Sequence, residues 1–386
     1  MTGPLDGIRV LDFTTTFSGP FCTLSLADLG ADVIKVEAPG GDITRGLGTA
    51  RVPGMTSIFI AGNRGKASVE LDLKDDRALA TVERLIGKAD CLVHNMRLPA
   101  AERVGIDPGR ACAINPRLVH ASITGFGSDG PYAGRPAYDD SIQAASGLAW
   151  LQSLSAPAPA YIATVIADKV AGMATANAIL AALFDRERTG LGQSIEVPMF
   201  ETLAGFALME QWGGRAFVPA EGPTGYSRLR AVHRRPYRTT DGLIAVVVYH
   251  AGHWQRFFNL IGQPELLEDE RYKTVQARSE HIDELYALVE RVIATRSTAQ
   301  WLTALAEIDV PAMPVVSLDA LFDDEHLNAV NFFRTVDAVD GDTYLVARPS
   351  AKFSRTPLED PAELGPPQPL GVGKDAVARW LGDDPE

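Results

Sequence analysis

Short apolar runs alternate with amphipathic stretches through the first half of the chain. The apolar runs are rich in Val, Ile and Leu and short enough for strands, which are expected over residues 7–13, 31–37, 67–73, 90–96, 117–127 and 193–199. Between them, the patterns predict helices over residues 22–30, 76–88 and 99–105. This order of strand and helix is typical of a parallel sheet, so we expect an α/β fold with a large Rossmann-like domain.

The composition changes near residues 211–240, where Gly, Pro and Arg accumulate and predict a linker with a mobile loop. Beyond it, a smaller α+β domain is predicted from strands over 243–250 and 310–317 and amphipathic helices over 254–261, 281–294 and 298–308. The expected parts are therefore a large domain (1–205), a linker (206–230), a small domain (231–325), a second linker (326–339) and a tail (340–386) that packs back on the large domain.

The longest helical pattern runs over residues 170–184, where Ala, Met, Ile, Leu and Phe recur at helical spacing. Gly190 lies where a left-handed C-terminal cap is expected, and Arg186 and Arg188 suit the negative end of the helix dipole. Asp168 lies at the start of this helix. By residue type and position alone, Asp168 is interpreted as an N-cap whose carboxylate accepts backbone N–H bonds.

The net charge of −13 argues against a nucleic-acid partner, which calls for a basic face. We expect no membrane-spanning segment, because no apolar stretch has the required length. The first residues, MTGPLDGIRV, lack the basic start and apolar run of a signal peptide, so we expect a cytoplasmic protein. If the ligand is a polyanion, a local cluster of Lys and Arg must bind it against this acidic background.

Cys22, Cys91 and Cys112 are odd in number and widely spaced, which predicts reduced core residues and no disulfide framework. The sequence contains no His/Cys cluster or HExxH pattern, so no metal site is expected. The loop after the first predicted strand lacks GxGxxG, so we expect a Rossmann-like fold without an NAD site.

Several segments, spread in order along nearly the whole chain, carry a resemblance to a known family. They are VLDFTTTFSGPFCTLSLADLGADVIKVEAPGGDITR, KASVELDLK, NMRLPAAERVGI, ASITGFGSDGPYAGRPAYD, VPAMPVVSLDAL and AKFSRTP. With the segment around Asp168, they resemble the family III CoA-transferases (the CaiB/BaiF family), which include formyl-CoA transferase and the carnitine and bile-acid CoA-transferases. The resemblance implies an interlocked homodimer that moves coenzyme A from an acyl-CoA donor to a carboxylic acid acceptor.

The resemblance also implies that Asp168 is the catalytic nucleophile. Moving CoA between two carboxylic acids without ATP requires a carboxylate that can itself be acylated. In the family, this aspartate attacks the donor thioester to give a mixed anhydride, and the released CoA thiolate then forms an aspartyl-CoA thioester. An anhydride reacts with water, so the site needs a lid. Gly222 and Gly225 lie where relatives place a glycine-rich loop, although a flexible linker fits them equally well.

A set of CoA-contacting positions follows from the same resemblance. The matching residues are Thr16, Phe17, Ser18, Leu71, Lys74, Asn95, Met96 and Arg103, with Tyr138 and Asp139 lining the active site. Arg97, together with Arg64 and Lys66, is expected to complete a basic patch, although an ordinary solvated charge is the alternative for each. We also hypothesise that Arg234 or Arg235 binds the acceptor carboxylate, because Arg suits bidentate carboxylate recognition.

Two departures from the family pattern bear on the substrate and on the reaction. Phe17 stands where formyl-CoA transferase has a glutamine near the acyl group, so we expect a different acyl group. Tyr138 stands where the related α-methylacyl-CoA racemases have the histidine of their two-base proton transfer. A 2-methylacyl-CoA racemase is therefore the alternative reaction, and a non-catalytic CoA-binding protein is the alternative class.

Overall fold

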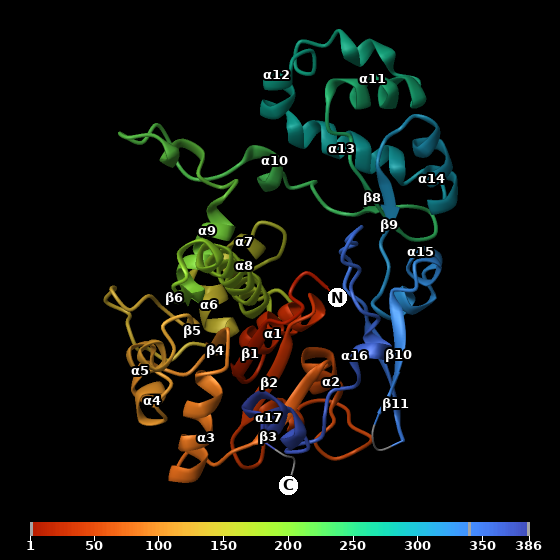
Figure 1. Ribbon diagram of the computed structural model, residues 1–386. Helices are drawn as coiled ribbons and strands as arrows, with labels where there is room; N and C mark the ends of the chain where they lie inside the picture. The colour runs from red at the N-terminus through yellow and green to blue at the C-terminus, as the bar shows by residue number, and fades with distance from the viewer. Residues whose placement is uncertain (1–2, 339–340, 384–386) are drawn as a thin grey trace. The chain divides into compact units, whose positions relative to one another are not determined.

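A computed structural model describes residues 3–338 and 341–383 and divides the chain into two compact units. Unit 1 comprises Met1–Ala149, Tyr161–Phe206 and Glu325–Glu386, and unit 2 comprises Trp150–Ala160 and Ala207–Asp324. Figure 1 shows the course of the chain with its elements labelled. Residues 339–340 and 384–386, which belong to the expected second linker and tail, lie outside the described residues.

Unit 1 is built on a six-stranded parallel sheet in the order β3-β2-β1-β4-β5-β6. Its strands are β1 (Arg9–Phe13), β2 (Asp32–Glu37), β3 (Lys66–Glu70), β4 (Cys91–His94), β5 (Val119–Thr124) and β6 (Gln193–Pro198). Each coincides with a predicted strand, which confirms the α/β, Rossmann-like fold. The strand order reverses between β1 and β4, and ligands of such sheets bind beyond the carboxyl ends of the strands at this point.

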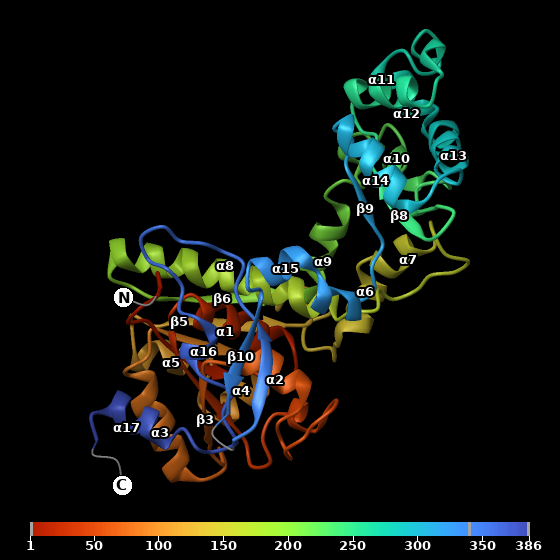
Figure 2. The same ribbon diagram turned by 90° about the vertical axis from the view of Figure 1, so that its right-hand side faces the viewer.

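Helices cover both faces of this sheet, with α1 and α8 on one face and α3, α5 and α17 on the other (Figure 2). The helices within unit 1 are α1 (Ser18–Asp28), α2 (Ser57–Asn63), α3 (Asp76–Ile86), α4 (Leu98–Arg103), α5 (Pro108–Ile114), α6 (Asp139–Ala145), α8 (Ile166–Thr189), α15 (Glu325–Ala329), α16 (Pro361–Leu364) and α17 (Lys374–Leu381), with the 3₁₀ turn η1 (Ile43–Gly46). The boundary between the units falls within α7 (Leu148–Gln152) and α9 (Met199–Leu208).

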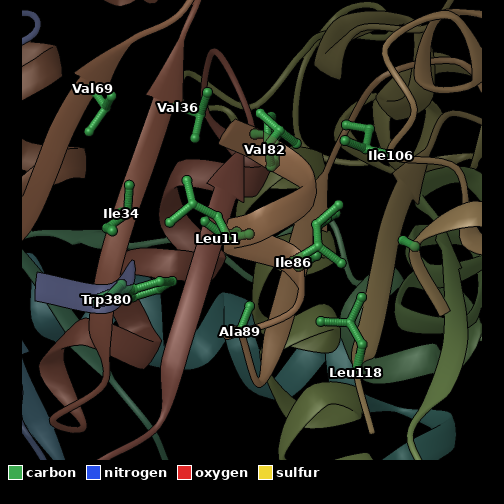
Figure 3. Packing of buried hydrophobic residues seen from close by; sticks show 14 of the residues in the cluster. Leu11, Ile34, Val36, Val69, Val82, Ile86, Ala89, Ile106, Leu118 and Trp380 are labelled. Carbon is green, nitrogen blue, oxygen red and sulfur yellow. The ribbon is translucent and has the colours of Figure 1, made fainter. Parts of the chain in front are cut away.

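One cluster of the core lies between the sheet and α3. Figure 3 shows Leu11 of the sheet facing Val82 and Ile86 of α3. Trp380 of α17 lies in the same cluster, and its indole N–H donates a hydrogen bond to Asp32 Oδ2 at 2.7 Å. The last helix of the chain is therefore anchored on one of the first strands.

Helix α8 is partly buried in unit 1. Among the described residues it is the one helix with the length and apolarity to cross a membrane, so the expectation that no stretch reaches that length was wrong. Half of its most apolar stretch is buried, and α8 packs there against α1, β5 and β6. Burial in a core accounts for this apolar composition. The helix ends at Gly190, whose φ of 75° confirms the predicted left-handed cap.

Unit 2 contains a small antiparallel sheet and a set of helices. Its elements are β7 (Tyr237–Arg238), β8 (Leu243–Val246), β9 (Ala312–Pro314), α10 (Ser227–Arg230), α11 (Ala251–Leu260), α12 (Val275–Glu280), α13 (Ile282–Ile293), α14 (Thr298–Glu307) and the 3₁₀ turns η2 (Gly213–Ala216), η3 (Pro264–Leu267) and η4 (Asp319–Asp323). Its own core gathers Trp254, Phe257, Leu285 and Trp301. Unit 2 is thus an α+β body.

The boundaries of the two units differ from the expected domain boundaries. Residues 207–230, expected as a linker, belong to unit 2, and so does the separate segment 150–160. The second expected linker contains α15 and strand β10 (Phe333–Asp337), which pairs with β11 (Thr343–Ala347) in unit 1. The two strands follow one another in the chain and pair antiparallel, with Asp337 opposite Thr343. Part of the expected linker is therefore an ordered strand of unit 1.

Helices α1 and α8 approach one another so closely that Gly172 has no room for a side chain. A Cβ atom at Gly172 would lie 2.6 Å from the carbonyl oxygen of Ser18 and 3.4 Å from the amide nitrogen of Cys22. Asp168 lies four residues before Gly172 and therefore on the same face of α8. The contact that requires Gly172 thus also brings Asp168 toward the start of α1.

Replacing Gly172 with Ala is expected to lower the free energy of unfolding by about 1–3 kcal/mol, measured by urea denaturation, because α1 must move away. Gly205 in α9 is the matched control, since among the described residues no heavy atom lies within 4 Å of its Cβ position. There the same change is expected to stabilise by up to about 1 kcal/mol, through the helix propensity of Ala alone. If the two substitutions had the same effect, the close crossing of α1 and α8 would be contradicted.

Candidate active site

A pocket of about 540 Å³ lies beyond the carboxyl ends of β1, β4 and β5 in unit 1. Its walls come from segments that are distant in sequence and follow different strands or begin different helices. They include Thr15, Thr16, Ser18, residues 95–99, residues 123–126, Ser128, residues 133–138, Asp168, Glu196 and Met199. The pocket therefore lies where the strand order reverses, as expected for a ligand site in this type of sheet.

Seven of the predicted site residues line this pocket together: Thr16, Ser18, Asn95, Met96, Arg97, Tyr138 and Asp168. The other five are not among the lining residues. Phe17 holds the N-cap position of α1, Leu71 packs against the core, Lys74 and Arg103 are exposed, and Asp139 is buried. The expectation about the acyl group, which was drawn from Phe17, therefore rests on the sequence alone.

Two of the three residues of the predicted basic patch, Arg64 and Lys66, are buried in ion pairs. Arg64 is buried and its guanidinium pairs with Asp28 at 2.6 Å. Lys66 is also buried, at 3.1 Å from Asp12, and its ammonium group donates further bonds to Thr23 and to a main-chain carbonyl. The expectation that these two cations face a ligand was wrong, because their charges are neutralised inside the fold. Arg97 remains exposed, and among the described residues no carboxylate pairs with it.

Asp168 is the third residue of α8, and Val165 holds the N-cap position. The interpretation of Asp168 as the N-cap was therefore wrong. The cap acceptor is the carboxylate of Asp139, whose Oδ1 accepts the amide N–H of Ala167 at 2.7 Å and that of Asp168 at 3.1 Å. Gln143 donates to the other oxygen of Asp139 at 2.6 Å. Since Asp139 satisfies the helix end, the carboxylate of Asp168 is not needed for capping.

The pKa of Asp168 is raised from its ordinary 3.8 to about 6. Burial is the main cause, because it disfavours the charged form, and the nearby Asp139 carboxylate adds to it. Hydrogen bonds from the hydroxyl and the backbone amide of Ser18 act in the opposite direction and lower the pKa. Asp168 is thus a carboxylate of unusually high basicity that is ionised near neutral pH, and a strongly shifted pKa in a pocket is typical of a functional group.

A second carboxylate, Glu196 at the end of β6, lines the pocket and was not predicted. Its Oε2 accepts the hydroxyl of Ser128 at 2.6 Å, and its Oε1 accepts the hydroxyl of Thr124 at 3.2 Å. In the alternating pattern of its strand, Glu196 looks like an ordinary solvent-facing residue. The one indication in the sequence that Glu196 belongs to a site is its position near the carboxyl end of a strand in a parallel sheet.

The remaining predicted features belong to unit 2. Gly222 and Gly225 lie in a segment whose main chain is bonded to that of residue 211, since the Gly225 amide donates to the carbonyl oxygen of Gln211 at 2.8 Å. Arg235 pairs with Glu290 at 2.9 Å, whereas Arg234 is exposed and has no carboxylate partner among the described residues. The lid role and the acceptor contact stay predictions, and the second now favours Arg234.

Comparison with known proteins gives one consistent result. The family model described as CoA-transferase family III matches residues 5–370. A Mycobacterium tuberculosis protein named "Probable fatty acyl-CoA transferase Rv3272" is 34% identical over 78% of this chain and 80% of its own length. The succinate–glutarate CoA-transferase of Agrobacterium fabrum is 34% identical over 92% of this chain and 90% of its own. The crystal structure of a CAIB/BAIF family protein from Brucella suis matches with a TM-score of 0.81 and 32% identity, over 99% of this chain and 100% of that one.

The Asp168 carboxyl group is expected to titrate with a midpoint near pH 6, which ¹³C NMR of the side-chain carboxyl carbons measures. Because this pKa lies above its ordinary 3.8, the contribution of Asp168 to folding stability falls as the pH rises through this interval. Asp139→Asn keeps an oxygen for the two amides but removes a negative charge, so the midpoint should move to lower pH. Glu196→Gln is the control and should leave it in place. An unchanged midpoint in Asp139→Asn would contradict this account of the site.

Proposed function

Because the chain belongs to CoA-transferase family III, we propose that it moves CoA from an acyl-CoA donor to a carboxylic acid acceptor through covalent intermediates on Asp168. The observation that carries this proposal is the state of Asp168 in the pocket. Its carboxylate is buried and basic, and the capping duty at the start of α8 belongs to Asp139. A nucleophilic carboxylate needs this combination of basicity and free oxygen atoms.

The proposed reaction begins when a carboxylate oxygen of Asp168 attacks the thioester carbonyl carbon of the donor. The C–S bond breaks, CoA leaves as a thiolate, and a mixed anhydride with Asp168 results. The thiolate then attacks the Asp168 carbonyl, the donor acid leaves as a carboxylate, and Asp168 carries CoA as a thioester. The acceptor carboxylate repeats the two steps in reverse and regenerates Asp168. No step requires a net proton transfer, so no separate general base is needed.

Three features of the pocket support this chemistry. Burial excludes water, to which an anhydride is sensitive. Ser18 lies at the pocket wall with its hydroxyl and amide bonded to Asp168, and both donors can stabilise charge that develops there. Asp168 also lies in the first turn of a 24-residue helix, whose amino end favours negative charge.

The racemase alternative finds less support in the same pocket. Two-base proton transfer needs a base that accepts a proton near neutral pH. No histidine is among the residues that line the pocket in the described part of the chain, and Tyr138 lies at the position in question. His94, which precedes the lining residue Asn95, is buried, and burial and the neighbouring His120 lower the pKa of His94 to about 3. A non-catalytic CoA-binding protein would not need a carboxylate with a raised pKa, such as that of Asp168.

Incubation with succinyl-CoA, acetyl-CoA or oxalyl-CoA followed by hydroxylamine is expected to convert Asp168 into a hydroxamate, detected by peptide mass spectrometry. Asp168→Asn should abolish the adduct and lower the transfer rate by a factor on the order of 10⁴ or more, as expected for removal of a nucleophile. Glu196→Gln is the control, since it removes the other pocket carboxylate and should keep the adduct. No adduct with any donor, together with deuterium incorporation at the substrate α-carbon, would favour the racemase instead.

We further propose that the chain forms a homodimer, and that this is the interlocked homodimer that the family resemblance implies. The exposed apolar residues of α8 support this, since Met173 is 56% and Phe184 is 68% exposed within the single chain. Apolar side chains on one helix that remain exposed are typical of a surface covered by a partner. Light scattering is expected to give twice the chain mass of 41.4 kDa. A mass equal to that of one chain would refute the dimer.

A further inference from the structure

Residues 14–16 belong to the loop between β1 and α1. Thr15 and Thr16 line the candidate pocket, and Phe17 separates them from Ser18. Thr16 has a φ of 72°, in the left-handed region. For a β-branched residue this conformation is an unfavourable outlier. Such a conformation persists only where surrounding groups hold it.

Side chains from four different segments hold the main chain of this loop. The carboxylate of Asp12 accepts the amide of Thr14 at 2.9 Å, and the Lys35 ammonium donates to the carbonyl oxygen of Thr14 at 2.7 Å. Asn95 accepts the amide of Thr15 at 3.1 Å and donates to its carbonyl oxygen at 2.8 Å. Asn95, predicted as a CoA contact, therefore has both ends of its amide group engaged with the loop.

Asp42 holds Thr16, the residue with the left-handed backbone, because its Oδ1 accepts the Thr16 amide N–H at 3.2 Å. Its other oxygen lies 3.0 Å from the ammonium of Lys35, and both side chains are almost fully buried. Asp42 is fixed in turn, because its own amide donates to Glu37 at 2.9 Å and the backbone amide of Thr44 donates to its Oδ1 at 2.9 Å.

The Lys35 ammonium group keeps its positive charge inside the fold. Burial lowers the pKa of Lys35, but the Asp12, Asp42 and Glu37 carboxylates outweigh this effect and raise it overall. The bonds that Asp12 and Lys35 make to the loop are therefore charge-assisted, and such bonds are stronger than bonds between neutral groups.

We propose that Asp42 is a positioning residue for the candidate active site, which holds Thr16 in its left-handed conformation and thereby sets the pocket wall and Ser18 for CoA binding. Asp42 does not itself line that pocket; it lines a separate cavity of about 500 Å³ beside Gly41 and Arg45. The effect on CoA rests on the proposed function, whereas the effect on the loop does not.

A residue that merely stabilises the fold must be separated from one that positions the loop. The pair Asp90–Arg186 provides the control, because its atoms lie 2.8 Å apart and Arg186 is buried. Asp90 precedes β4, at the amino ends of the strands and so at the edge of the sheet opposite the pocket. Removing its carboxylate breaks an ion pair of unit 1 whose arginine is buried, without touching the loop.

The experiment compares the wild type with Asp42→Ala, Asp42→Asn and Asp90→Ala. Hydrogen exchange read by mass spectrometry reports on a peptide that contains residues 13–17, and titration calorimetry with CoA itself reports on binding. Asp42→Ala should accelerate exchange of that peptide and weaken CoA binding about tenfold, which equals about 1.4 kcal/mol. Asp42→Asn keeps an oxygen for the Thr16 amide, so it should fold more readily and show a smaller change in both measurements.

Asp90→Ala should lower the melting temperature while CoA binding and exchange of the loop peptide stay at the wild-type values. The positioning role is overturned if exchange of the loop is unchanged in both Asp42 variants, or if exchange rises while CoA binding does not weaken. It is also overturned if Asp90→Ala weakens CoA binding as much as Asp42→Ala. A wild type that fails to bind CoA would instead refute the proposed function, and the exchange data alone would then decide whether Asp42 holds the loop.

Discussion

The contact between α1 and α8 at Gly172 is the constraint on which the candidate site depends. Backbone meets backbone there, so neither helix can shift without a clash or a gap. One turn earlier on the same face of α8 is Asp168, and the residue of α1 that meets Gly172 is Ser18, which also bonds to Asp168. The packing of two core helices and the geometry of the reactive carboxylate are therefore set by one contact.

Two aspartates divide the tasks at the start of α8. A helix end leaves amide groups that must be satisfied, and a carboxylate that accepts them is held in place and weakened as a nucleophile. Asp139 takes this task from the start of another helix, α6, and its charge raises the pKa of Asp168. Capping from another element thus leaves Asp168 both free and basic, which capping by Asp168 itself could not do.

Sequence patterns predicted what depends on local order, and missed what depends on burial and distant contacts. The six strands and the cap at Gly190 follow from runs of apolar residues and from one glycine. Arg64 and Lys66 look like surface cations in the sequence, and only the fold shows them paired inside it. Seven of the residues named by the family resemblance line one pocket. The capping role of Asp139 depends on the fold, because a carboxylate 29 residues away gives no local signal.

The buried charges beneath the loop of residues 14–16 are difficult to explain by stability alone. A buried ion pair is often no more stabilising than well-packed apolar residues of the same volume, because both charges lose their hydration. Apolar side chains, however, have no directional bond with which to hold a main-chain amide such as that of Thr16. A carboxylate at Asp42, with Lys35 to balance its charge, supplies that bond inside the fold. Charged groups thus take the place of apolar packing and fix the conformation of one loop. We expect this only where the shape of that loop matters to a ligand.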